Sequence, residues 1–228
     1  MRIYIGFIIY LLILSMQIEC TYKIKNMKDE AKVATFSKEL VARKFGEFFI
    51  YPMHNETIDA IWKDSYNHKL IDKILLDSTN NVTVEAKFLA CEIFFKKDIF
   101  FMQRHAPEEI AGIYTQALVN NYTGMANSWG LLYEHKDDGT VGIAFLTIGE
   151  KSIPSLVKLL DNENTTLTYQ GSIEAVTGNS YGYRIKDFAA YYIGRIMGKP
   201  LKYYPKLDDR DKQIVNLKKE IKLYLNKK

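Results

Sequence analysis

The stretch Ile185-Lys186-Asp187-Phe188-Ala189-Ala190-Tyr191-Tyr192-Ile193-Gly194-Arg195-Ile196 decides the fold class of this chain. Its apolar and small residues recur every three or four positions, at Ile185, Phe188, Ala189, Tyr192, Ile193 and Ile196. On a helix with about 3.6 residues per turn, this spacing gathers them into one stripe along a single face. The stretch therefore predicts an amphipathic α-helix whose apolar face packs against the rest of the protein.

The same helical spacing recurs through most of the chain. It is found in residues 58–75, 110–118, 141–148, 153–160 and 209–225, and less regularly in residues 28–48. Residues 84–95 are apolar on nearly all sides, as expected of a helix with neighbours on several faces. The glycine-containing stretches 121–140 and 165–183 predict loops, and the second is also compatible with a short hairpin. The fold class that follows is all-α.

Two kinds of landmark repeat along this helical pattern. Pro107 and Pro154 each open a short amphipathic helix, and Ala144 and Ala189 each lie in the middle of another helix. Both intervals match the period of roughly 40–47 residues that is typical of paired-helix solenoids. A helix pair cannot bury its own apolar face, so such pairs stack and the terminal ones need polar caps.

Residues 144–161 resemble one HEAT repeat. The likeness rests on an alanine-rich first helix, a glycine turn at Gly149, an Ile153-Pro154 opening and a close at residues 159–161 that reads Leu-Leu-Asp. Residues 184–196 resemble the first helix of the next unit, with a basic start and paired alanines. The resemblance is clearest over residues 139–197 and extends to residues 82–121.

This resemblance implies a short, irregular α-solenoid of HEAT-like helical hairpins with long loops, in which residues 209–225 form the terminal cap. It also implies a structural role for Arg184 and Asp187, because they match positions that join neighbouring repeats in that family. We therefore expect residues 21–228 to form a single helical domain.

The first twenty residues have the composition of an export signal or a membrane anchor. Arg2 precedes an apolar run from Ile3 to Ile18, and Cys20 follows it. A cleaved signal peptide and an uncleaved anchor both fit this pattern. Cys20 is a candidate lipidation site because it resembles the modified cysteine of bacterial lipoproteins, although Glu19 stands where that pattern has a small residue. We expect the protein to be exported to the periplasm, the cell envelope or the extracellular space, with residues 1–20 contacting the membrane if they are retained or lipidated.

The charge pattern argues against a nucleic-acid partner. The 228 residues include 31 basic and 27 acidic side chains, which gives a net charge of +4. The charges are interspersed, and no basic stripe of the kind that binds nucleic acid is present in the sequence. The second cysteine, Cys91, lies in an apolar stretch and is expected to be a small buried hydrophobe.

The sequence predicts no catalytic residues, no metal site and no cofactor. The four histidines, His54, His68, His105 and His135, are far apart, and none has a second ligand at metal spacing. Nucleophile and phosphate-loop motifs are absent from the sequence. Tyrosine is enriched at interfaces, so we expect an interaction surface at Trp129, Tyr169, Tyr181 and Tyr183.

Four Asn-x-Ser/Thr sequons occur, at Asn55, Asn81, Asn121 and Asn164. They matter where the host glycosylates such sites in its secretory pathway. Four matches in a chain that contains Asn and Thr can also arise by chance.

Three functions remain open. The first is an exported, non-enzymatic module that binds another protein, for example an inhibitor or an immunity-type protein. The second is a ligand-binding protein or a lyase-like enzyme on a HEAT-like scaffold. The third is a structural protein of the cell envelope. The first rests on the HEAT resemblance, and fold alone does not give function.

Overall fold

The computed structural model describes residues 2–50, 55–79, 81–98, 100–130, 138–171, 173–202 and 205–226. Side chains are described in these ranges except at residues 2–22, 24–26 and 55. All regular structure in the described ranges is helical, and they contain no β-strand. The prediction of an all-α fold is confirmed for this part of the chain.

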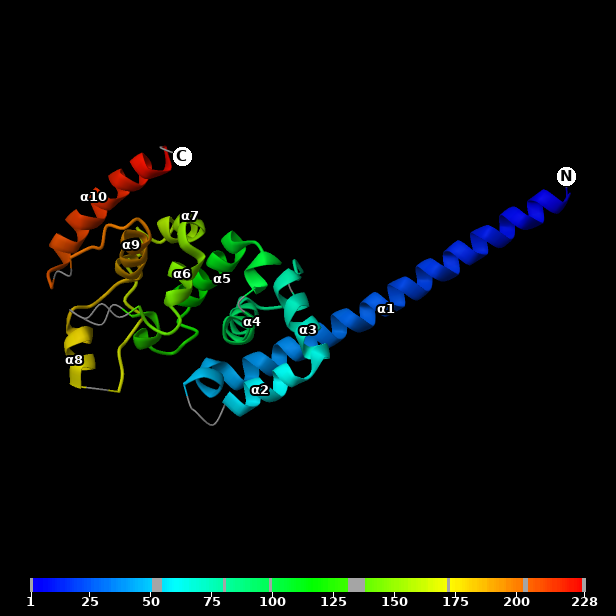
Figure 1. Ribbon diagram of the computed structural model, residues 1–228, viewed down its shortest axis with the longest axis horizontal. Helices are drawn as coiled ribbons and strands as arrows, with labels where there is room; N and C mark the ends of the chain where they lie inside the picture. Colours follow the sequence, from blue (N-terminus) through cyan, green and yellow to red (C-terminus); the bar gives the residue numbers. More distant parts are fainter. Residues whose placement is uncertain are drawn as a thin grey trace.

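Long helices near the two ends of the chain flank shorter ones between them (Figure 1). The α-helices are α1 (Arg2–Phe49), α2 (Asn55–Lys63), α3 (Ser65–Leu76), α4 (Val84–Lys97), α5 (Pro107–Val119), α6 (Ile143–Ile148), α7 (Ile153–Val157), α8 (Ile173–Ser180), α9 (Ile185–Ile196) and α10 (Leu207–Leu225). The described ranges also contain the 3₁₀ helices η2 (Phe101–Gln103), η3 (Ala126–Trp129) and η4 (Gly149–Ser152).

Two predicted segments differ from the structure. The predicted helix over residues 58–75 is divided into α2 and α3, because the Asp64 carboxylate accepts a hydrogen bond from the Tyr66 amide (2.8 Å) and caps the start of α3. The stretch 165–183, predicted to be a loop or a hairpin, contains α8 after a segment without regular secondary structure. The other predicted helices are present with shifted boundaries.

Successive helices pack against one another from one end of the molecule to the other. Contacts join α1 to α4, α4 to α5, α5 to α7, α7 to α9 and α9 to α10. Figure 1 shows α1, α2 and α3 grouped at one end of the helical body and α10 at the other. Each of these helices therefore buries apolar side chains against its neighbours in the stack.

Aromatic rings connect these helices through the core. Phe45 of α1 lies 5.7 Å from Phe88 of α4, measured between ring centroids, and Phe88 lies 5.4 Å from Tyr114 of α5. Tyr114 is 6.0 Å from Phe145 of α6, which is 5.1 Å from Tyr192 of α9. All five side chains are buried. Because large rings bury the most apolar area, this row is the centre of the core.

Helix α1 connects the apolar start of the chain to this core. Its N-terminal part projects away from the helical body (Figure 1). Lys44 has φ 58° and ψ 159°, so α1 consists of two helical segments joined at a kink. In the ranges whose side chains are described, no helix is apolar over a length that could cross a membrane. The side chains of the apolar run at residues 3–18 lie outside those ranges, as does that of Cys20.

Candidate functional site

The predicted aromatic surface does not form, because three of its four residues are buried. Trp129, Tyr169 and Tyr183 are in the core, and Tyr181 is half-buried. The Tyr169 hydroxyl donates to the Gly130 carbonyl oxygen (3.0 Å), and the Trp129 ring stacks on Phe88. The prediction that these side chains form an exposed interface is therefore corrected: their apolar area stabilises the fold.

An ionic cluster lies where α9 begins. The Asp187 carboxylate accepts hydrogen bonds from the Arg184 backbone amide (2.8 Å) and from the Arg184 guanidinium (3.1 Å). The Arg210 guanidinium of α10 donates to the same carboxylate (2.8 Å). The chain dictates this arrangement locally, because an acidic side chain at the third helical position can bond to the amide that precedes the helix.

Further charged side chains surround Arg184, Asp187 and Arg210. Lys186 forms ion pairs with Glu163 and with Asp211 (2.7 Å), and Asp211 also pairs with Arg184 (2.9 Å). The hydrogen bond from Arg184 lowers the pKa of Asp211, and that from Lys186 lowers the pKa of Glu163. Three cations and three carboxylates neutralise one another in the whole cluster. It joins α9 to α10 and to the segment before α8, which is a structural role.

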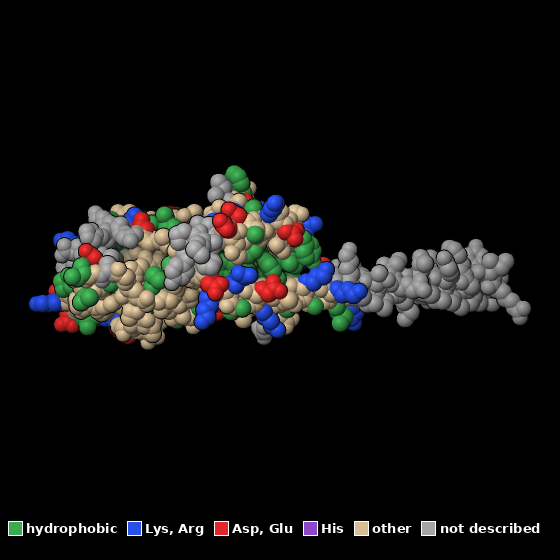
Figure 2. All heavy atoms as spheres, turned by 90° about the horizontal axis from the view of Figure 1, so that it is seen from below, with side chains coloured by type: hydrophobic (Ala, Val, Ile, Leu, Met, Phe, Trp, Pro, Cys, Tyr) green, Lys and Arg blue, Asp and Glu red, His purple; other side chains and the backbone are tan. Residues whose placement is uncertain are grey.

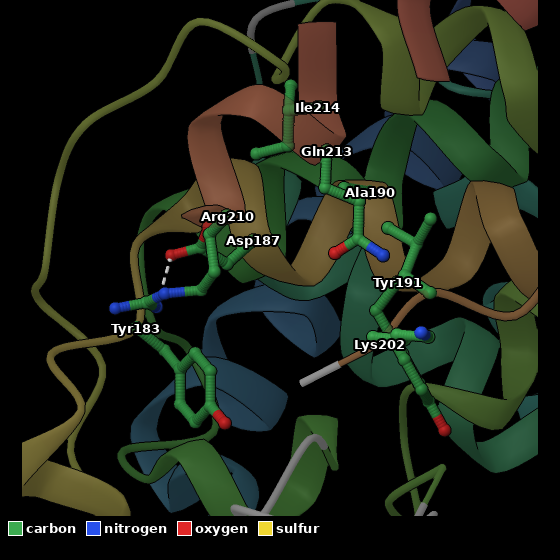
Figure 3. Close-up of a pocket in the computed structure, with 9 residues that line it drawn as sticks. Tyr183, Asp187, Ala190, Tyr191, Lys202, Arg210, Gln213 and Ile214 are labelled. Carbon is green, nitrogen blue, oxygen red and sulfur yellow. Dashed lines mark hydrogen bonds and ion pairs between the residues drawn. The ribbon is translucent and has the colours of Figure 1, made fainter. Parts of the chain in front are cut away.

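A recess beside this cluster is too small for a substrate. Figure 3 shows Tyr183, Ala190 and Gln213 around it, with Arg210 paired to Asp187 at one side. Its volume is about 30 Å³. That is the room of roughly one water molecule, whereas small-molecule sites enclose about 300–1,000 Å³.

A wider groove lies between the C-terminal part of α1 and the loop after α5. Its volume is about 490 Å³. Lys44 and Asn121, whose φ angles are both positive, line it together with Arg43, Glu47 and Glu85. Desolvation raises the pKa of Glu85 although the Lys44 ammonium opposes this. The ligand-binding alternative would place its ligand here.

Glu92 is a carboxyl group in the core. It projects from α4 toward α5, where the Tyr114 hydroxyl donates a hydrogen bond to Oε1 (2.5 Å). Desolvation by burial raises the pKa of Glu92 to about 7, although the bond from Tyr114 and the charge of Lys96 lower it. The buried Glu92 carboxyl is therefore mostly protonated below pH ~7 and mostly ionised above it.

The histidines are not brought together. His105 precedes α5, and its Nε2 lies 2.8 Å from an oxygen of Asp72 in α3. The His68 ring stacks on Trp62 with the ring centroids 3.9 Å apart. His54 and His135 lie outside the described residues. Within the described ranges, no group of three His, Cys, Asp or Glu side chains could hold a metal ion.

Helix α8 presents the feature that sequence reasoning missed. Ile173 and Val176 are 83 % and 69 % exposed, the two largest values among the large apolar side chains described. They are three residues apart and therefore neighbours on one face of the helix. Figure 2 shows hydrophobic side chains at the surface of the end of the molecule where α8 lies in Figure 1. Ile173 and Val176, called the α8 pair below, thus form an outward-facing apolar surface.

The opposite face of α8 fixes its position. The small residues Ala175 and Gly178 are buried. The Asn179 side chain accepts a hydrogen bond from the Tyr169 amide (2.7 Å) and donates one to the Tyr169 carbonyl oxygen (3.0 Å). The glycines at 171, 178 and 182 favoured a loop in the sequence. The signal for this helix was the spacing of Ile173 and Val176 with small residues between and after them.

Searches against protein-family models, curated proteins and solved structures found no match to this chain.

Proposed function

We propose that this chain is an exported, non-enzymatic protein-interaction module built on a HEAT-like helical scaffold, and that the α8 pair contacts its protein partner. The observation that carries the proposal is the exposure of Ile173 and Val176 on a helix anchored through its opposite face. Export is supported by the apolar run at residues 3–18, and the HEAT-like scaffold by the likeness over residues 139–197.

The energetic argument concerns side chains that the fold leaves in water. Burying a Val or Ile side chain is worth about 1.5–3 kcal/mol relative to leaving it exposed. Ile173 and Val176 are neighbours on one face of α8, which is fixed in place by its opposite face. A partner that buries them would therefore gain this free energy with little loss of conformational entropy in α8. Single exposed apolar residues are common on protein surfaces, and interaction sites are marked by contiguous ones. Ile173 and Val176 are contiguous on the surface of α8.

The test is photo-cross-linking in the native host. The full chain carries a photo-reactive residue at position 173, and a matched chain carries it at Val215, an exposed apolar position on α10. We expect one adduct of defined mass from position 173 and none of that mass from position 215. Replacing Val176 by Ser should reduce the adduct, whereas Leu223→Ser on α10 should not.

Two outcomes would contradict the proposal. One is the same set of adducts from both positions, which indicates non-specific contact. The other is an adduct at position 173 that Val176→Ser leaves unchanged. Urea unfolding of each variant is the control, because a surface substitution away from the core is expected to change stability by no more than about 0.5 kcal/mol.

A further inference from the structure

The structure distinguishes among three of the four sequons of this chain. At Asn121 the backbone is left-handed (φ 51°), and Oδ1 is buried without a hydrogen-bond partner among the described residues. The Thr123 hydroxyl of that sequon is buried and donates to the Met125 carbonyl oxygen (2.9 Å). The Asn121 side chain is therefore partly enclosed by the folded protein.

The sequon at Asn81 is exposed, but the fold uses its hydroxyl. Thr83 is the N-cap of α4, and its oxygen accepts a hydrogen bond from the Ala86 amide (3.2 Å). The side chain of the fourth sequon residue, Asn55, lies outside the described part. Asn164 remains.

Asn164 lies in the irregular segment that precedes α8. The side chains of Asn164, Thr165 and Thr166 are all exposed. The backbone is held in place, since the Ile185 amide donates to the Asn164 carbonyl oxygen (2.9 Å) and the Asn164 amide donates to the Asn162 side chain (3.0 Å). Of the three sequons whose side chains are described, this one alone combines an exposed Asn side chain with a hydroxyl that no described group engages.

We propose that Asn164 is an N-glycosylation site of the exported protein. This inference rests on the export that forms part of the proposed function. The sugar donor is a lipid-linked oligosaccharide. A bond forms between Nδ2 of Asn164 and C1 of the first sugar, and the bond between C1 and the donor's phosphate oxygen breaks. The amide loses one proton, and the lipid pyrophosphate leaves.

The experiment is mass spectrometry of the full chain isolated from its native host. We expect the peptide that contains Asn164 to carry a glycan, and the peptide that contains Asn121 to be unmodified. Enzymatic removal of the glycan should convert Asn164 to Asp. Thr166→Ala should abolish the modification, whereas Thr166→Ser should retain it because a sequon needs a hydroxyl at that position.

Thr165→Ala is the matched control. It removes a neighbouring exposed hydroxyl but keeps the Asn-x-Thr sequence, so the glycan should persist. An unmodified Asn164 in the wild-type chain overturns the proposal. Cell fractionation in the same experiment distinguishes the cause. A bare Asn164 on an exported chain refutes the glycosylation site alone, whereas a bare Asn164 on a cytoplasmic chain refutes export as well.

Discussion

At the scale of single residues, Glu92 makes the stability of the fold depend on pH. Its pKa in the native state is about 7, against a value of 4.5 for an ordinary glutamate, because burial disfavours the charged form. Between these two pH values the native state holds a proton that the unfolded state has lost. Stability is therefore fully present below pH ~4.5 and falls as the pH rises to about 7.

The first prediction follows from that difference. The free energy of unfolding should decrease by about 3 kcal/mol between pH ~4.5 and pH ~7 through this group, since one pKa unit corresponds to about 1.4 kcal/mol. Urea unfolding across this range measures it. Glu92→Gln is the control and should remove most of the decrease. An unchanged pH dependence in that variant would contradict the assignment to Glu92.

Gly142 is a second residue whose environment tolerates no side chain. A Cβ at this position would overlap the Tyr192 hydroxyl and lie 2.6 Å from the Asp138 carbonyl oxygen. That hydroxyl donates to the same carbonyl oxygen (2.5 Å), so the added atom would also break a partly buried hydrogen bond.

We expect Gly142→Ala to lower the free energy of unfolding by about 1–3 kcal/mol, the usual cost of overpacking a core. Gly112 is the matched control, because it lies inside α5 and a Cβ there would meet no atom within 4 Å. Gly112→Ala should stabilise the protein by about 0.5–1 kcal/mol. Thermal unfolding compares the two, and equal effects would refute the predicted overlap.

At the scale of helices, Arg210 determines how α10 packs on α9. Its guanidinium donates to Asp187 and to the Tyr181 carbonyl oxygen (2.5 Å). The same group lies over the Tyr183 ring, 4.9 Å from the centroid. Burying a charge is costly unless it is paired, so these contacts act as a unit.

Arg210→Ala should therefore destabilise the protein by about 3–5 kcal/mol, since it removes one partner of a buried ion pair. The control is Lys212→Ala on the same helix, whose pair with Asp209 (3.4 Å) is exposed and should contribute at most about 1 kcal/mol. Urea unfolding provides both values. Similar losses in the two variants would contradict a special role for Arg210.

At the scale of the whole molecule, the described part of the core begins within α1. Val33 is the first buried apolar side chain of the described ranges, and Leu40 and Phe45 follow it in α1. The N-terminal part of α1 projects away from the other helices in Figure 1. The helical body therefore needs only the C-terminal half of α1.

Removing residues 1–20 should leave the free energy of unfolding unchanged within about 0.5 kcal/mol, because the deletion takes away no described core side chain. Removing residues 1–41 should abolish cooperative unfolding, since Val33 and Leu40 are lost with their helix. Circular dichroism during urea titration distinguishes the two. Loss of the transition in the shorter deletion would show that the apolar start belongs to the core.

The sequence by itself determined that the chain is helical and where most of the helices lie. The stripe from Ile185 to Ile196 predicted α9, and Pro107 marked the start of α5. These features are local, because periodic burial and the conformational limits of proline act within one or two helical turns. The break between α2 and α3 also has a local cause, the cap formed by Asp64. The sequence pattern did not predict this break, because the helical spacing of apolar residues continues on both sides of Asp64.

Only the tertiary structure decided which side chains face water. Trp129 and Tyr183 looked suited to an interface but are buried, whereas Ile173 looked like part of a loop and is exposed. It also decided that Arg210 meets Asp187 and that Glu92 is buried against Tyr114. Such outcomes depend on how separate helices stack, and the free energy of that stacking comes from contacts between residues that are distant in the sequence.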